Sequence, residues 1–219
     1  MIDLHTHTIW SDGVLVPAEM VQQARAKGIL GLALTDHVDE SNLLLVVPAL
    51  VHFCNGLAGF STFPVLPGFE ITHVWPAQIA RLVRRGRELG AKIVVMHGET
   101  VVEPVPPGTN HAAILAGVDI LAHPGLITEA DVKLAARAGV ALEISARQGH
   151  SLANGHLARL AKKFGAKLVL NTDAHEPGDL IAEDFARIVA KAAGLSDSDF
   201  SRMQTNSRRF MKPRRPRPD

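Results

Sequence analysis

Seven short apolar runs recur along this 219-residue chain, and segments with helical patterning separate them. The runs cover residues 2–5, 31–35, 63–69, 91–96, 119–122, 140–144 and 167–170. Strands that alternate with helices are typical of parallel βαβ units, and about 30 residues per unit matches the size of such a repeat. The chain is therefore predicted to form an α/β fold around a parallel sheet.

Helix signals fill the intervals between the apolar runs. Pro17 suits the first turn of a helix that ends near Gly28, and residues 41–58 are expected to be helical with a kink or break at Pro48. Residues 76–89 and 179–193 are further helix candidates. Other helices are expected to follow capping residues, with Asn110, Thr128, Ser151 or Asn154, and Ser196 as the candidate caps.

Side chains that bind metals follow six of the seven apolar runs. The nine candidates are His5, His7, Asp12, His37, Glu70, His97, His123, Asp173 and His175. Imidazole and carboxylate are usual protein ligands of Zn, Mn and Fe. In an open sheet these residues would spread along one edge, whereas in a barrel the carboxyl ends of all strands meet at one mouth. The pattern therefore favours a barrel with more than one metal ion at its mouth.

Composition excludes several other classes of protein. The net charge of +1 gives no field that would recruit nucleic acid or a membrane surface. The most apolar stretch, residues 43–51, is far shorter than the roughly 20 residues of a membrane helix, and no signal peptide is visible. Cys54 is the single cysteine and is expected to be buried. We expect a cytoplasmic protein with one domain over residues 1–210 and a basic, disordered tail over 211–219.

Taken together, the motifs resemble those of the PHP (polymerase and histidinol phosphatase) family of metal-dependent phosphoesterases. The resemblance covers roughly residues 1–210 and is carried by His5-Thr-His7, Ser11-Asp12-Gly13, Thr35-Asp36-His37, Gly68-Phe-Glu70, His97, His123-Pro124 and Asp173-Ala-His175. It implies a distorted seven-stranded (β/α)7 TIM-like barrel, with the metal site at the C-terminal ends of the strands. It also implies a stand-alone PHP domain protein.

The resemblance further implies a trinuclear site for three divalent Zn, Mn or Fe ions. One ion would be held by His5, His7, Glu70 and Asp173, a second by Glu70, His97 and His123, and a third by Asp12, His37 and His175. The implied reaction is hydrolysis of a small phosphomonoester, as in a histidinol phosphatase, by a hydroxide that bridges two metals. A PHP-type nuclease or phosphodiesterase, an amidohydrolase barrel, and a non-catalytic metal-stabilised binding module are the alternatives.

Several residues outside the ligand set are candidates for contact with substrate. Arg147 follows the sixth run, which no ligand follows, and is expected to clamp a phosphate group. His73 and Glu99 lie shortly after ligand positions and are further candidates, whereas His150 is expected at the surface. The predicted catalytic set is Glu70, Asp173, His175 and Arg147. The expected partner is a small phosphorylated metabolite, with neither nucleic acid nor membrane, and the oligomeric state does not follow from the sequence.

Overall fold

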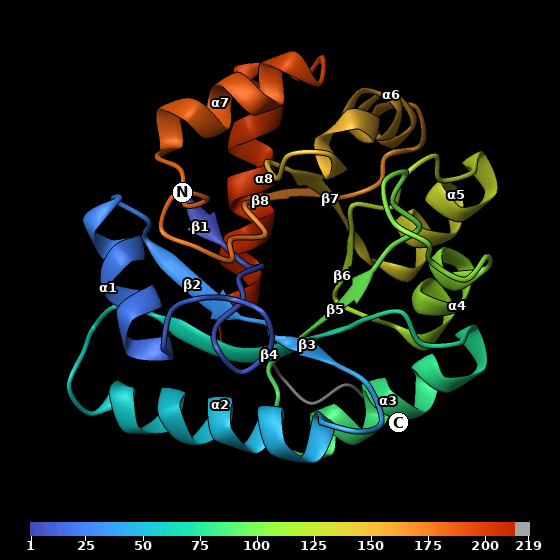
Figure 1. Cartoon of the computed structure of the whole chain (residues 1–219). Helices are drawn as coiled ribbons and strands as arrows, with labels where there is room; N and C mark the ends of the chain where they lie inside the picture. The colour runs from blue at the N-terminus through green and yellow to red at the C-terminus, as the bar shows by residue number, and fades with distance from the viewer. Residues whose placement is uncertain (213–219) are drawn as a thin grey trace.

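The computed structural model describes residues 1–212, which form a barrel of parallel strands with helices around it (Figure 1). The strands are β1 (Ile2–Asp3), β2 (Gly31–Leu34), β3 (His37–Val38), β4 (Val65–Ile71), β5 (Ile93–His97), β6 (Ile120–Ala122), β7 (Ala141–Ser145) and β8 (Leu168–Asn171). Seven of them form the path β1-β2-β4-β5-β6-β7-β8, and the short β3 pairs with β4. The seven apolar runs supply these seven strands, which confirms the predicted TIM-like (β/α)7 barrel.

Helices lie on the outside of the barrel. They are α1 (Pro17–Ala26), α2 (Leu43–Ala58), α3 (Pro76–Glu88), α4 (Thr109–Ala116), α5 (Glu129–Ala138), α6 (Asn154–Phe164), α7 (Glu183–Ala192) and α8 (Asp197–Phe210), with a short 3-10 helix η1 (His150–Ala153) before α6. Both α7 and α8 follow the last strand. Among residues 1–212, no helix combines the length and the apolar character that a membrane crossing requires. The predicted disordered tail falls almost entirely on residues 213–219, which lie outside the described part of the chain.

The barrel is nearly closed where β1 approaches β8. A single parallel bridge joins Thr6 to Ala174, and His7 N–H donates a hydrogen bond to the Ala174 carbonyl at 2.8 Å. Asp173 N–H donates to the His5 carbonyl at 3.0 Å in the same seam. This closure brings the first metal-binding motif of the sequence beside the last one.

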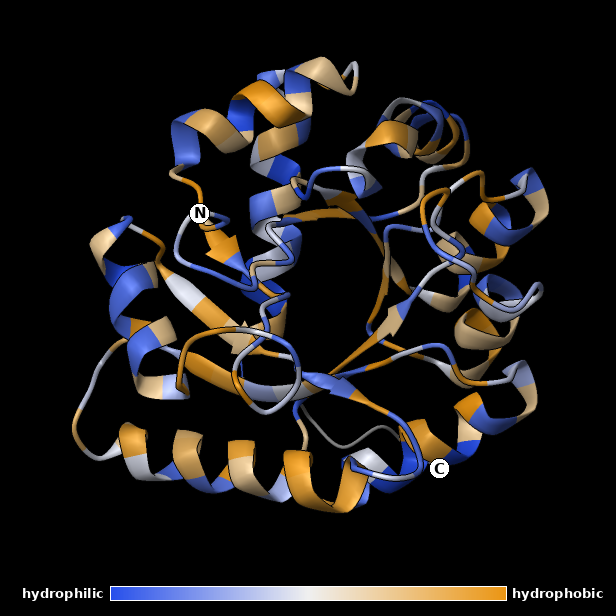
Figure 2. Cartoon of the chain, viewed as in Figure 1, coloured by the Kyte–Doolittle hydropathy of each residue, from blue (hydrophilic) through white to orange (hydrophobic). Residues whose placement is uncertain are grey.

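The core has two layers, because alternate residues of each strand face opposite sides. In β5, Val94 and Met96 pack toward the helices, whereas Ile93 and Val95 face the lumen. Figure 2 shows that the strands are largely apolar, with most of the hydrophilic colour on loops and outer helix faces. Phe210, the last residue of α8, and Met211 after it pack against the lumen cluster. The lumen is therefore filled with side chains, and a site for polar ligands is left at the open mouth.

Several helix boundaries differ from the sequence-based expectations. The helix α2 continues through Pro48, so a break there was wrong. Val46 and Leu50 are buried in the core, and this packing outweighs the roughly 3 kcal/mol that an internal proline costs. Thr128 and Ser196 cap α5 and α8 as predicted. Asn110 does not cap α4, which begins after Gly108.

Cys54 lies on the buried side of α2, as expected. Burial raises the pKa of its thiol to about 12. The thiolate is therefore scarce at neutral pH, and the residue packs as a small apolar side chain.

Gly86 marks the closest approach between α3 and the sheet. A Cβ atom at this position would lie 2.1 Å from Cζ of the fully buried Phe69. Gly86→Ala is therefore expected to lower the free energy of unfolding by about 1–3 kcal/mol through overpacking. The gain in helix propensity, about 1 kcal/mol, opposes this loss. Urea unfolding followed by circular dichroism measures the difference.

Gly56 provides a matched control for this substitution. It lies in α2, and a Cβ atom there would meet nothing within 4 Å. Gly56→Ala is expected to leave stability unchanged or to raise it by up to about 1 kcal/mol. Equal effects of the two substitutions would contradict the close contact between Gly86 and Phe69.

Candidate metal centre

The nine candidate ligands converge at the C-terminal mouth of the barrel. The segment after β1 carries His5, His7 and Asp12. The strands β3, β4 and β5 carry His37, Glu70 and His97. The segment after β6 carries His123, and the segment after β8 carries Asp173 and His175. The strand register sets part of this arrangement, because His37 on β3 is paired directly with Glu70 on β4. Side chains from the first and the last strand thus come within ligand distance of one another.

Glu70 is the centre of the arrangement and is fully buried. Its Oε1 lies 3.3 Å from His5 Nε2 and 3.6 Å from His123 Nε2. Its Oε2 lies 2.7 Å from His37 Nδ1 and 3.6 Å from His7 Nε2. The two oxygens of one carboxylate therefore face different histidines, which is the arrangement of a carboxylate that bridges two ions.

Asp173 forms a second bridge inside the cluster. Its Oδ1 lies 3.2 Å from His7 Nε2 and 3.6 Å from His5 Nε2, and its Oδ2 lies 3.7 Å from His123 Nε2. Its side chain is 3% exposed. Glu70 and Asp173 thus both contact His5, His7 and His123.

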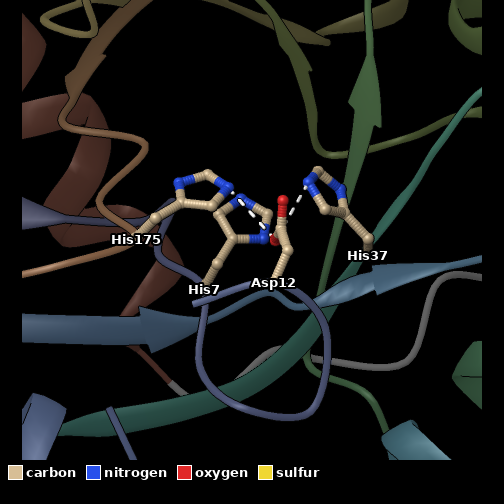
Figure 3. A group of neighbouring side chains, drawn as sticks. All are labelled: His7, Asp12, His37 and His175. Carbon is tan, nitrogen blue, oxygen red and sulfur yellow. Dashed lines mark ion pairs between the residues drawn. The ribbon is translucent and has the colours of Figure 1, made fainter. Parts of the chain in front are cut away.

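A more open group lies at the edge of the mouth (Figure 3). The Asp12 carboxylate lies between two imidazoles, with Oδ1 3.2 Å from His175 Nε2 and 3.5 Å from His37 Nε2. His7 stacks on His175 with ring centroids 4.2 Å apart. The Asp12 side chain is 58% exposed, so this group is open to solvent.

Four buried ligand atoms of the centre form no hydrogen bond with the described residues, and this indicates whether metal ions fit the site. His5 Nε2, His7 Nε2 and both oxygens of Glu70 are buried without a hydrogen-bond partner among the described residues. An unpaired buried polar group costs about 1–3 kcal/mol, and an unpaired charge costs more. Divalent ions would satisfy all four atoms, and imidazole and carboxylate are their usual ligands. The residues present therefore fit a metal centre.

The charges of the cluster keep the central carboxylate ionised. Burial by itself would raise the pKa of Glu70, but the adjacent His5 and His37 hold it well below its usual range. Burial likewise disfavours protonation of His5, yet Glu143 and Glu70 raise its pKa well above the ordinary value. The cluster thus places carboxylate and imidazolium groups next to each other in a buried space. Bound cations would replace the imidazolium protons as the positive charges beside the carboxylates.

Backbone strain is concentrated at this mouth. Among residues 1–212, the non-glycine residues with positive φ are His73 (53°), His123 (27°) and Asp173 (55°). Such conformations cost about 1–3 kcal/mol each. They persist only where the contacts of the surrounding structure hold the residue in place. Two of the three are candidate ligands, and the third lies beside them.

The three substrate candidates occupy different places. Arg147 lines the mouth pocket, and its Nη1 donates hydrogen bonds to the Asp173 carbonyl at 3.0 Å and to Asp179 Oδ2 at 3.3 Å. His73 lines the same pocket. Glu99 faces away from it, because its Oε1 accepts a hydrogen bond from Asn110 N–H at 2.8 Å and lines a neighbouring cavity.

Three residues of the site were missed in the sequence. Glu143 on β7 accepts a hydrogen bond from His5 Nδ1 at 2.9 Å, so the sixth apolar run does contribute to the centre. His150 was expected at the surface, which was wrong: it is 6% exposed and stacks on His123 with centroids 4.1 Å apart. Glu103 Oε2 lies 2.9 Å from His97 Nε2, and the hydrogen bond with His97 lowers the pKa of Glu103 to about 2.

The sequence did contain an indication that Glu143 belongs to the site. An isolated acidic residue inside an apolar strand is buried only when it has a partner. His150 begins the short helix η1 and Glu103 lies in the β5–α4 loop, and neither position carries such an indication. A larger groove of about 470 Å³ lies elsewhere, between α6 and α8. Its carboxylate, Asp199, accepts a hydrogen bond from Ser196 N–H in the capping box of α8 and pairs with Lys162, so the groove does not resemble the mouth.

The fold and the site define a parallel barrel with clustered metal ligands, and comparison with known proteins places it in a family. The sequence profile of the PHP domain matches residues 3–103. The chain is 42% identical over 199 residues to an uncharacterized protein of Methanocaldococcus jannaschii, covering 90% of this chain and 91% of the relative. It is 30% identical over 218 residues to a probable phosphatase of Shewanella sp. strain MR-4, covering 87% and 82%.

A solved structure gives the same fold. Histidinol phosphate phosphatase from Lactococcus lactis, in complex with zinc, L-histidinol and phosphate, has a TM-score of 0.60 at 19% identity, covering 89% of this chain and 94% of that one. The chain belongs to the PHP domain family, which confirms the resemblance inferred from its motifs.

Proposed function

We propose that this chain is a metal-dependent phosphoesterase that hydrolyses a small phosphomonoester at the barrel mouth. The observation that carries the proposal is the set of buried, unpartnered ligand atoms on His5, His7 and Glu70, which face one another across the mouth. Packing alone would not leave these atoms unpaired at the same place.

The donor set divides into three groups, in support of three ions. As the family resemblance implies, His5, His7, Glu70 and Asp173 would hold the first, Glu70, His97 and His123 the second, and Asp12, His37 and His175 the third. The structure brings these residues into overlapping groups of possible ligands, among them His5, His7 and Glu70, and Asp12, His37 and His175 with His7. When bound, Zn, Mn or Fe ions supply an activated water nucleophile and neutralise charge that develops on a phosphoryl group. Glu70 would belong to both of the first two groups, because its Oε1 lies near His5 of the first and near His123 of the second.

The remaining residues of the mouth would bind and orient the substrate. The pocket has a volume of about 330 Å³, near the lower end of the range for small-molecule sites. Arg147 is held at its wall by Asp179, and its guanidinium group suits a phosphate oxygen. The probable phosphatase from Shewanella and the histidinol phosphate phosphatase from Lactococcus lactis support a phosphomonoester as the substrate class.

A substrate panel tests this proposal. The protein, loaded with Mn²⁺ or Zn²⁺, is assayed against histidinol phosphate, nucleotides, sugar phosphates, a phosphodiester and short oligonucleotides. We expect the highest kcat/KM for a phosphomonoester. Preferential cleavage of oligonucleotides would contradict the monoesterase proposal, and the absence of turnover with every ester would favour a non-catalytic binding module.

A further inference from the structure

Glu103 reaches the barrel mouth from the β5–α4 loop, and none of the nine ligand positions includes it. Its Oε2 lies 2.9 Å from His97 Nε2 and 3.3 Å from His73 Nε2, and its Oε1 lies 3.6 Å from His150 Nε2. Three imidazoles thus surround one carboxylate. We propose that Glu103 is a further protein ligand of the ion held by His97 and His123, and that His73 and His150 position it.

The distances fit a shared ion. Ligand atoms that are each about 2.0–2.2 Å from one cation lie about 2.9–3.5 Å apart, according to the angle between them. The separation of 2.9 Å between Glu103 Oε2 and His97 Nε2 falls in this range. His123 Nε2 and Glu70 Oε1, which share the same ion in the proposed centre, are 3.6 Å apart.

The orientations of the rings separate ligands from positioning residues. The lone pair of an imidazole lies in the plane of its ring, so rings that converge on one ion have intersecting planes. His97 and His123 meet at 70°, as two ligands of one ion should. His150 lies nearly parallel to His123, at 16°, so these two rings stack face to face rather than converge as His97 and His123 do. Its contact with the free oxygen of Glu103 therefore assigns His150 a positioning role.

The loop that carries Glu103 is fixed over the mouth by specific contacts. Thr100 Oγ1 is 2.7 Å from His150 Nδ1, which leaves Nε2 of this histidine to face Glu103 Oε1 at 3.6 Å and Asp173 Oδ2 at 3.7 Å. The Asn110 side chain accepts a hydrogen bond from Glu99 N–H and donates one to the Pro124 carbonyl. The loop also approaches Gly125 so closely that a Cβ atom there would lie 1.9 Å from the Glu99 carbonyl oxygen.

The backbone conformation of His73 independently supports a binding role for this part of the mouth. His73 is one of three non-glycine residues with positive φ among residues 1–212, and the other two are the candidate ligands His123 and Asp173. Its ring stands edge-on to His97 at 81°, with centroids 4.7 Å apart. Its Nε2 contacts Glu103 Oε2 at 3.3 Å, although the side chain is partly exposed to solvent.

The inference rests on the proposed metal centre and is tested by metal binding rather than by turnover. Metal-free protein is titrated with Mn²⁺ by calorimetry, and the ion content is measured after dialysis. In Glu103→Gln, one binding step is expected to weaken about tenfold or more, and the other steps are expected to keep their affinities. His73→Gln is expected to weaken the same step by a smaller factor.

Glu88→Gln is the matched control, because Glu88 is an exposed carboxylate on α3 that pairs with Arg85. It is expected to leave every binding step unchanged. Wild-type Mn²⁺ affinities in a folded Glu103→Gln protein would overturn the inference and leave the proposed phosphoesterase intact. Absence of any tightly bound ion in the wild-type protein would overturn the metal centre itself, on which both proposals depend.

Discussion

Glu70→Gln is expected to abolish nearly all phosphoesterase turnover, with a fall in kcat/KM of at least about 10³-fold. The amide keeps the shape of the side chain but removes the charge that faces His5 on one side and His37 on the other. A bridging carboxylate contributes to two ions at once, and loss of metal charge stabilisation of several kcal/mol corresponds to at least a thousandfold in rate. Metal analysis and steady-state kinetics on the same samples measure the two losses together.

Glu129→Gln controls for the change of charge, since Glu129 is an exposed residue of α5 that pairs with Lys163. This variant is expected to retain wild-type metal content and turnover. Circular dichroism checks that Glu70→Gln remains folded, which we expect because a neutral amide removes a buried charge. Full turnover by metal-depleted Glu70→Gln protein would refute the bridging role.

Glu143→Gln is expected to weaken metal binding by about 10- to 100-fold, although Glu143 is not among the nine candidate ligands. Its Oε2 accepts a hydrogen bond from His5 Nδ1 at 2.9 Å and another from Asn171 Nδ2 at 2.8 Å. The carboxylate therefore fixes the His5 tautomer and leaves Nε2 free to bind an ion. Competition with a coloured chelator measures the change in affinity.

A purely structural role for Glu143 would give a different result. If the residue only stabilised the barrel, Glu143→Gln would lower the thermal stability of the metal-free protein and leave metal affinity unchanged. We expect the reverse, with the stability of the metal-free protein close to wild type and the affinity reduced. Unchanged affinity would therefore contradict the positioning role.

The strands and the positions of the candidate ligands at the barrel mouth could be predicted from the sequence because both depend on local patterns. A parallel strand that is buried on both faces is a continuous apolar run, and the residue that follows it lies at the mouth. His37, Glu70 and His97 all follow this rule, since each stands at the end of an apolar run and reaches the mouth of the barrel. Thr128 and Ser196 were identified as caps by equally local signals.

The failures have a common physical origin in long-range packing. The helix α2 passes through Pro48 because its buried face packs on the core, which local propensity does not record. The Asn110 side chain forms hydrogen bonds with the backbone of Glu99 and of Pro124, in two different loops, instead of capping a helix. His150 is buried because the chain after β7 folds back over His123, a contact between segments that no periodicity links.

Local patterns in the amino-acid sequence were enough to specify the barrel, the family and the identity of the nine candidate ligands, since strand periodicity and ligand chemistry are local properties of a chain. The relative placement of those candidate ligands, and of the residues that contact them, depends instead on tertiary contacts. Closure of β1 against β8 sets Asp173 beside His5, and the loops over the mouth bring Glu103 and His150 to His97 and His123. Such contacts depend on the three-dimensional paths of distant loops, and a linear pattern does not encode them.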